Sequence, residues 1–445
     1  MHRSFKKYLS NTSWLFFANG LKLFSNFFLS IFIIRYLGAE KFGILSYAIS
    51  FVGLFSAFSS FRLDSIVVKE LLNKQEEKNE IYGTAFIIKI LGCIFVSIII
   101  LTYIHYSSLN FVTKIVFVFI LLGLFFQNFK VIDFYFQSKV LLKYSSIVII
   151  YKEIILSLFK IGLIIANCNL IWFAFALTLD HILFAIGLLY MYMKKGENIL
   201  NWKIKKSLFF QFIKESYPLV LSGVLATINI RIDQIMIKFF LGFEAVGKYA
   251  AATRFNQMIN LIPILIATSL FPAIVNSKKN NEEVYHSRLQ FLYDLMVLIT
   301  FSIGIPAFVF SKQIILLIYG NDFYESIIVF QIYIWVTIFV FLGVIRGRWI
   351  VIENLQHLSL IYNSIAVIYN ITANYFLIPV YGIKAAAWNS LVAMFLSIYL
   401  LNLCNKKTYI LFVMISKSFY HVVSFKFVKR LINETKNIET RSFKN

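Results

Sequence analysis

Polar side chains recur at helical spacing inside the most apolar segments of this 445-residue chain. Asn19, Lys22, Asn26 and Ser30 follow one another at intervals of three and four residues, so a helix would align them along one face. A charged side chain in the middle of a bilayer costs roughly 2.5–3.5 kcal/mol on insertion scales, so it normally faces a partner, a ligand or water. This face is therefore a candidate site for binding.

Other apolar segments carry similar groups. The further candidates are Lys152, Glu153 and Lys160 in 145–166; Arg231 and Asp233 in 216–239; Arg254, Gln257 and Asn260 in 246–275; and Asn363, Asn370 and Asn374 in 358–379. Two interpretations compete for each residue. One is hydrogen bonding between helices with snorkelling of long cations, which suits Lys89, Lys130 and Lys238 best. The other is a water-filled cavity of net positive charge.

The cavity interpretation predicts an anionic ligand, because cations outnumber acids on these segments. Arginine grips phosphate with two parallel hydrogen bonds, and lysine supplies a point charge. The anion-binding residues predicted in this way are Lys22, Lys152, Lys160, Arg231 and Arg254. Amide side chains suit sugar hydroxyls, which gives Asn19, Asn26, Gln257, Asn260, Asn363, Asn370 and Asn374 as the predicted sugar-facing set. Glu153 and Asp233 are the candidate proton or ion sites.

The elements that position these residues must be membrane helices. Hydrophobic residues make up 60% of the chain and charged residues only 14%, which excludes a soluble enzyme, a disordered chain and a disulfide scaffold. The sequence predicts an all-α polytopic membrane protein with about 12 transmembrane helices. The expected spans are 12–34, 43–61, 81–103, 115–136, 145–166, 171–193, 216–239, 246–275, 289–310, 326–345, 358–379 and 383–403.

The formal net charge of +22 tests this topology. With both termini in the cytoplasm, the inner connections and tails hold 29 Lys+Arg and the outer connections hold 5. This imbalance follows the positive-inside rule and accounts for most of the charge without nucleic acid as a partner. The basic tail 404–445 contains an apolar stretch, 408–428, for which an interfacial helix is favoured over a thirteenth span.

A short motif occurs twice, 204 residues apart. Leu37 through Gly43 and Leu241 through Gly247 share the pattern L-G-x-E-x-x-G, and each copy joins two expected spans. We expect the glycine pair to permit a tight turn with positive φ. Because six spans separate the copies, the two halves must have the same orientation. The expected division is a lobe at 1–193, a cytoplasmic linker at 194–215, a lobe at 216–403 and a tail at 404–445.

The sequence predicts no catalysis, cofactor or metal. Cys93, Cys168 and Cys404 are far apart in apolar stretches, and the histidines have no ligand spacing. The P-loop pattern G-x-x-x-x-G-K-[ST] is not present. The expected outer connections are also short, whereas membrane glycosyltransferases and polymerases generally need a larger outer segment to hold acceptor sugars.

The chain resembles the Wzx-type O-antigen and polysaccharide flippases of the multidrug/oligosaccharidyl-lipid/polysaccharide exporter superfamily. The resemblance covers residues 8 to about 403. It is carried by the stretches 11–15 (Asn-Thr-Ser-Trp-Leu), 35–48 (beginning Arg-Tyr-Leu-Gly), 63–64, 217–219 and 241–252, and by Asp233.

This resemblance implies a V-shaped cavity between two six-helix lobes and transport by alternating access, with ion-gradient coupling. The implied cargo is an oligosaccharide on undecaprenyl diphosphate, an O-antigen or related polysaccharide repeat unit, moved from the cytoplasmic to the periplasmic leaflet of the bacterial inner membrane. Related flippases hold the diphosphate with cavity cations, and Lys22, Arg62 and Arg254 lie on comparable helices, so the resemblance adds Arg62 to the predicted anion-binding residues. Membrane lipids are expected partners, with a polysaccharide polymerase and a chain-length regulator as further candidates. A cation-coupled drug exporter of the same superfamily and a membrane polymerase or glycosyltransferase are the alternatives; Lys22, with no acid in the first span, disfavours the exporter.

Overall fold

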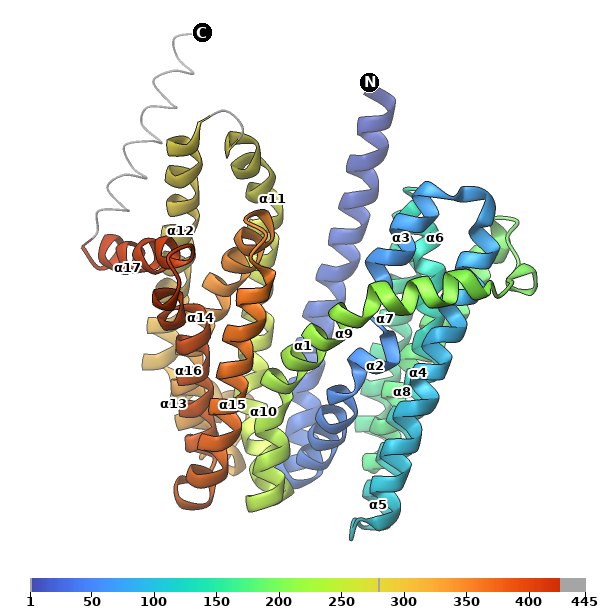
Figure 1. The fold of residues 1–445 in the computed structure, drawn as a ribbon. Coiled ribbons are helices and arrows are strands. Elements are labelled where there is room, and N and C mark those ends of the chain that lie inside the picture. Colours follow the sequence, from blue (N-terminus) through green and yellow to red (C-terminus); the bar gives the residue numbers. More distant parts are fainter. Residues whose placement is uncertain (1, 279–280, 425–445) are drawn as a thin grey trace. The chain divides into compact units, whose positions relative to one another are not determined.

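The fold is built from helices, and no strand occurs among the residues that the structure describes. The structure is a computed structural model that describes residues 2–278 and 281–424 (Figure 1). By its internal contacts the chain divides into two compact units, Met1–Ala250 and Ala251–Asn445. Each unit is described by itself.

The first unit contains the elements up to the first turns of α10. They are α1 (His2–Leu54), α2 (Ser56–Ser60), α3 (Asp64–Asn73), η1 (Gln75–Glu77), α4 (Lys78–Tyr106), α5 (Phe111–Gln127), η2 (Asn128–Lys130), α6 (Val131–Ser138), α7 (Leu142–Ile165), α8 (Leu170–Lys194), η3 (Ile199–Asn201), α9 (Lys206–Leu241) and α10 (Phe243–Ile259). Helix α1 packs against α7, α9 and α5, and α8 packs against α5 and α7.

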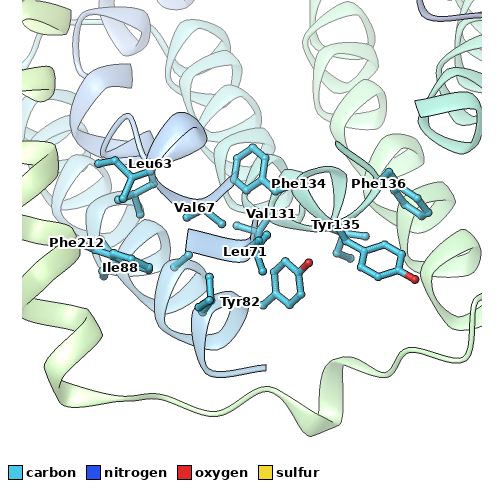
Figure 2. Close-up of a cluster of buried hydrophobic side chains, with 14 of the residues drawn as sticks. Leu63, Val67, Leu71, Tyr82, Ile88, Val131, Phe134, Tyr135, Phe136 and Phe212 are labelled. Atoms are coloured by element: carbon cyan, nitrogen blue, oxygen red, sulfur yellow. The ribbon is translucent and has the colours of Figure 1, made fainter. Parts of the chain in front are cut away.

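A cluster of buried hydrophobic side chains fixes one end of this unit. It gathers residues of α3, α4, α6, α8 and α9 around Tyr82, Phe136, Tyr192 and Phe212, each at most 1% exposed (Figure 2). The first turns of α9 belong to this cluster, because Phe212 packs into it. Residues 206–215, which were expected to belong to a linker, form the first turns of α9 and pack into this cluster.

The two copies of the repeated motif have the same backbone conformation at their first glycine. Gly38 has φ 70° and ψ 176°, and Gly242 has φ 87° and ψ −174°. Only glycine adopts this region readily, so the predicted positive φ is confirmed at both positions. It is wrong for the second glycine of each copy, since Gly43 and Gly247 are helical.

The second glycines serve a reciprocal close approach of the two copies. A Cβ on Gly43 would strike the backbone carbonyl of Phe243, and a Cβ on Gly247 would strike that of Ala39. Phe243 and Ala39 hold the same place in their motifs, so the contact has the two-fold character that a duplicated element would give. The two copies of the repeated motif are therefore in direct contact.

This contact begins a longer antiparallel seam between the second part of α1 and α9. Farther along, Ser50 donates to Gln234 over 2.7 Å, and the Thr227 hydroxyl lies 3.3 Å from the carbonyl oxygen of Leu54. Small residues at helix interfaces in membranes permit such close packing. We call the contact of α1 with the start of α10 and with α9, from Gly43 to Thr227, the glycine seam.

The second unit comprises the rest of α10 and the following elements. They are α11 (Leu261–Lys278), α12 (Glu282–Val309), α13 (Ser311–Tyr319), η4 (Asn321–Phe323), α14 (Ser326–Ile352), α15 (Gln356–Tyr381), α16 (Ile383–Ile398), η5 (Leu400–Cys404) and α17 (Tyr409–Val423). Helix α14 packs against α12 and α16, and α16 packs against α15.

Helix α17 falls on the apolar stretch of the tail. It has 15 residues, fewer than the roughly 20 that a spanning helix needs. The buried Asp294 of α12 anchors it, accepting from Ser418 over 2.6 Å and lying 2.9 Å from His421 Nδ1. This length fits the expected interfacial helix better than a thirteenth span. Residues 425–428 and the rest of the predicted tail lie outside the described residues.

The protein is an all-helical, multi-pass membrane protein. Nine helical segments in the described chain are long and apolar enough to cross a membrane. The first of these, Ser13–Leu54, covers the expected span 12–34 almost completely and the larger part of 43–61, with Gly38 between them. The expected spans at 145–166 and 246–275 fall on α7 and on α10 with α11, which are not among the nine. The number twelve and the two six-helix lobes stay predictions.

Candidate functional site

The polar face of α1 meets α7 through side-chain hydrogen bonds. Asn26 donates to Glu153 over 2.8 Å, and Lys160 Nζ lies 3.4 Å from Asn26 Oδ1. The hydroxyls of Ser25 and Ser157 are 2.7 Å apart. The structure thus brings together three residues that the sequence nominated on two separate segments.

A buried ion-pair network adjoins this contact. Lys152 Nζ contacts Asp180 of α8 and lies 3.8 Å from Glu153 Oε2. Lys152, Glu153 and Lys160 are buried, whereas Lys22, which interacts electrostatically with Lys152, Glu153 and Asp180, is partly exposed. Three lysines face two carboxylates here. In this conformation Lys22 is therefore the cation of the cluster that a ligand can reach.

Arg231 lies in the glycine seam. Its Nη1 is 3.4 Å from the Ser50 hydroxyl, and its Nε would be 3.3 Å from a Cβ on Gly53. Asp233 is 2% exposed and accepts a hydrogen bond from Tyr249 over 2.7 Å. Gly53 thus makes room for the guanidinium, and Asp233 is held inside the protein.

Arg62 follows a break between α2 and α3. Phe61 and Arg62 both have φ 49°, a left-handed conformation that costs roughly 1–2 kcal/mol for a residue with a side chain. The guanidinium lies against α9, where a Cβ on Gly223 would be 2.7 Å from Arg62 Nε. The Arg62 side chain is exposed and makes no ion pair with the described residues. Such strain is typical of functional sites.

In the second unit, Arg254 and Gln257 are neighbours on α10. Arg254 Nη1 donates to Gln257 Oε1 over 3.2 Å. Gln257 is exposed, and Arg254 is partly exposed and interacts electrostatically with Tyr319. Asn260 occupies the break between α10 and α11, and its buried Oδ1 accepts no hydrogen bond within the described part of the chain.

The amides of α15 connect that helix to α16. Asn389 donates to Asn374 over 2.9 Å, and Asn374 donates to Asn370 over 3.1 Å; all three are at most 2% exposed. Asn363 accepts from Ser397 over 2.7 Å. This geometry fits hydrogen bonding between helices rather than the predicted contact with sugar. By contrast, Asn19 of α1 is exposed.

The site prediction omitted several residues that shape these clusters. Asp180 is the partner of Lys152, and Lys89 and Lys130 lie in a polar pocket with Arg62. Arg346 of α14 is 2% exposed, with its charge 5.3 Å from the Tyr362 ring centre and no carboxylate paired to it in the described residues. For Asp180, Lys89 and Lys130 the available signal was their position inside expected spans, whereas Arg346 directly follows the expected span 326–345. Partner choice, however, depends on packing that spacing does not give.

The clusters can hold an anion by charge and hydrogen bonding. Among the described residues, no group of three or more His, Cys, Asp or Glu side chains is arranged to hold a metal ion. The reachable cations Lys22 and Arg62 and the exposed amides Asn19 and Gln257 are suited to non-covalent recognition of phosphate and hydroxyl groups.

Comparisons with known proteins identify the family and the fold. The profile of a family described as "Polysaccharide biosynthesis protein" matches residues 8–278. The capsular polysaccharide biosynthesis protein CapF of Staphylococcus aureus is 22% identical over 398 residues, which are 88% of this chain and 97% of that protein.

Two solved structures share the fold. The lipid II flippase MurJ in an inward closed conformation has a TM-score of 0.70 at 16% identity, covering 94% of this chain and 93% of its own. An inward-facing multidrug resistance MATE transporter of the MOP superfamily has a TM-score of 0.69 at 12% identity, covering 91% and 95%.

Proposed function

We propose, from the premise that this chain belongs to the polysaccharide biosynthesis protein family, that it is a flippase for lipid-linked oligosaccharide. It moves an oligosaccharide carried on undecaprenyl diphosphate from the inner to the outer leaflet of the bacterial cytoplasmic membrane. Family membership is the observation that carries the proposal, and the transporter fold supports it. Both termini lie in the cytoplasm, as the distribution of Lys and Arg indicates.

The polar clusters suggest how the cargo is held. In the first unit, Lys22, Arg62 and Arg231 supply positive charge for the diphosphate, and the exposed amide of Asn19 meets sugar hydroxyls. Arg254 and Gln257 offer the same chemistry in the second unit. The lipid tail stays in the bilayer. Binding sites in such transporters lie near the middle of the membrane. A change between inward-open and outward-open states then exposes the cargo to the other side.

The test is the leaflet on which the cargo accumulates when the gene is deleted. A flippase leaves lipid-linked oligosaccharide on the inner leaflet, whereas loss of a polymerase leaves single units on the outer leaflet. Alanine at Lys22, Arg231 and Arg254 together should abolish export while the protein still reaches the membrane. The control carries alanine at three exposed lysines, Lys41, Lys69 and Lys417. Wild-type export by the first variant would reject this mechanism.

Glu153 is the favoured site of ion coupling. It is 1% exposed, its Oε2 makes no hydrogen bond in the described chain, and Lys152 and Asn26 adjoin it. Protonation would change the balance of this buried network. Glu153→Gln should therefore make transport in vesicles independent of a proton gradient. Gradient-driven transport at the wild-type rate would move the assignment to Asp233 or to another ion.

The fold shared with a multidrug transporter keeps drug export as a second candidate. The vesicles used for oligosaccharide flipping serve this comparison too. Efflux of a cationic dye without movement of lipid-linked oligosaccharide would favour drug export over flipping. A polysaccharide polymerase and a chain-length regulator are proposed as neighbours in the pathway.

A further inference from the structure

A polar pocket lies beside Arg62, at the break between α2 and α3. It has a volume of about 230 Å³ and is lined by Arg62, Lys89, Lys130, Asp64, Asn128 and Ser60, among others. This volume is below the roughly 300–1,000 Å³ of pockets that enclose a drug-sized ligand. The pocket can take a small charged group, and a whole oligosaccharide would not fit.

The charge of the pocket selects an anion. Three cations, Arg62, Lys89 and Lys130, face one carboxylate, Asp64. Asp64 is shared between two of them, at 3.4 Å from Lys89 Nζ and 3.9 Å from Lys130 Nζ. Arg62 makes no ion pair with the described residues, so its fork of N–H donors is available. A planar guanidinium beside two ammonium groups is suited to phosphate.

The surrounding structure holds these cations in place. Lys89 is 3% exposed, and its Nζ lies 4.9 Å from the ring centre of Phe134, a member of the buried cluster in Figure 2. The left-handed pair Phe61–Arg62 ends α2, and Gly223 leaves room for the guanidinium. Buried lysine and strained backbone are features that a merely solvated surface does not need.

The depth of the pocket fits the inner leaflet. In the expected topology, Arg62 directly follows the inner end of span 43–61. Lys89 and Lys130 lie about two turns from the inner ends of spans 81–103 and 115–136. Two turns are roughly 11 Å, so these lysines lie in the inner half of the hydrocarbon region, below the headgroup phosphates.

We propose that this pocket is a loading site that binds the diphosphate of the lipid-linked substrate at the inner leaflet before transport. The proposal rests on the proposed function and adds a site outside the α1–α7–α8 cluster. Lys89 and Lys130 join Arg62 as ligands of the diphosphate, Asp64 holds the two ammonium groups on one side of the pocket, and the sugar chain remains outside the pocket.

Binding of radiolabelled pyrophosphate to the full-length protein in nanodiscs tests the site. We expect Arg62→Gln and Lys130→Gln each to weaken binding at least tenfold, and Arg62→Lys to weaken it less because the charge remains. The matched control is Lys69→Gln, an exposed lysine of α3 that does not line the pocket, and it should bind within twofold of wild type. Equal binding by wild type, Arg62→Gln and Lys130→Gln would overturn the proposal.

Competition distinguishes the lipid carrier from other phosphate sources. Farnesyl diphosphate, a soluble prenyl diphosphate, should displace pyrophosphate at lower concentration than unlabelled pyrophosphate does. If farnesyl diphosphate and unlabelled pyrophosphate displace the label equally well, the pocket is a site for free phosphate. If phosphatidylglycerol displaces it as well as farnesyl diphosphate does, the pocket is a general lipid site. Either result overturns the loading role. Failure of the wild type to flip lipid-linked oligosaccharide, with binding lost in Arg62→Gln, would reject the proposed function. Flipping by the wild type with binding unchanged in Arg62→Gln would reject the pocket alone.

Discussion

Replacing Gly43 by alanine should force the two copies of the repeated motif apart. The new Cβ would overlap the carbonyl oxygen of Phe243 and lie 2.7 Å from its carbon, while ordinary contact begins at 3.4 Å. Contact with the carbonyl carbon alone requires a local separation of about 0.7 Å, and the nearer oxygen requires more, because backbone atoms cannot rotate away. Overpacking of this kind costs typically 1–3 kcal/mol. The closed crossing would lose on the order of 5–150-fold in population to states in which the copies are apart.

Access to Ser50 measures this shift. Ser50 is 0% exposed and lies in the glycine seam, hydrogen-bonded to Gln234. In a protein lacking Cys93, Cys168 and Cys404, Ser50→Cys should react with maleimide severalfold faster when Gly43 is alanine. Gly247→Ala should act in the same direction, because its Cβ would strike Ala39.

Gly20→Ala is the matched control for this experiment. A Cβ there meets nothing within 4 Å, so alanine should leave labelling unchanged and stabilise α1 by up to about 1 kcal/mol. If the alanine variants at Gly43, Gly247 and Gly20 all label at one rate, the seam does not close the path to Ser50. The reasoning from backbone contact would then be refuted.

Three further changes probe the buried polar groups, with thermal unfolding as the measurement. Asp180→Asn should destabilise the first unit by on the order of 3 kcal/mol, because it removes the nearer carboxylate partner of buried Lys152 and leaves Glu153 at 3.8 Å. Adding Lys152→Met should restore most of that loss, and no recovery would show that the pair is not coupled. Arg346→Met should leave the melting temperature unchanged or raise it. The change replaces a buried guanidinium, which has no carboxylate partner in the described chain, by an apolar group. A clear drop in melting temperature would point to an anion bound there. Asn389→Ala should cost about 1 kcal/mol by removing the donor to Asn374, and a neutral result would mean that the amide ladder adds nothing.

Composition and charge were sufficient to predict the class of fold. An apolar chain whose lysines and arginines collect on alternate connections must cross a membrane repeatedly, and this does not depend on details of packing. The motif at Gly38 and Gly242 was also readable, because a positive φ is a local property of the backbone. The closeness of Gly43 to Phe243 was not, since it depends on how two distant segments meet.

The polar residues show the same limit. Helical spacing placed Asn26 and Glu153 on faces of their own helices, and the structure joins those faces. Spacing could not distinguish a face toward a ligand from one toward another helix, so Asn370 and Asn374 were grouped with sugar-facing residues although they are buried. Arg62 was predicted as a binding residue, but its pocket was not. The left-handed turn at Phe61 contains no glycine, so the sequence gives no sign of it.

The place of α9 determines how this protein can be recombined with its relatives. The repeat suggests a crossover point before residue 216, yet α9 already packs at Phe212 into the cluster of the first unit and continues along α1. A chimaera joined at the repeat boundary would graft a foreign helix onto surfaces shaped for this one. Crossovers placed after Leu241 would instead inherit α9 together with its complementary partners, and libraries of hybrids should survive there in greater number.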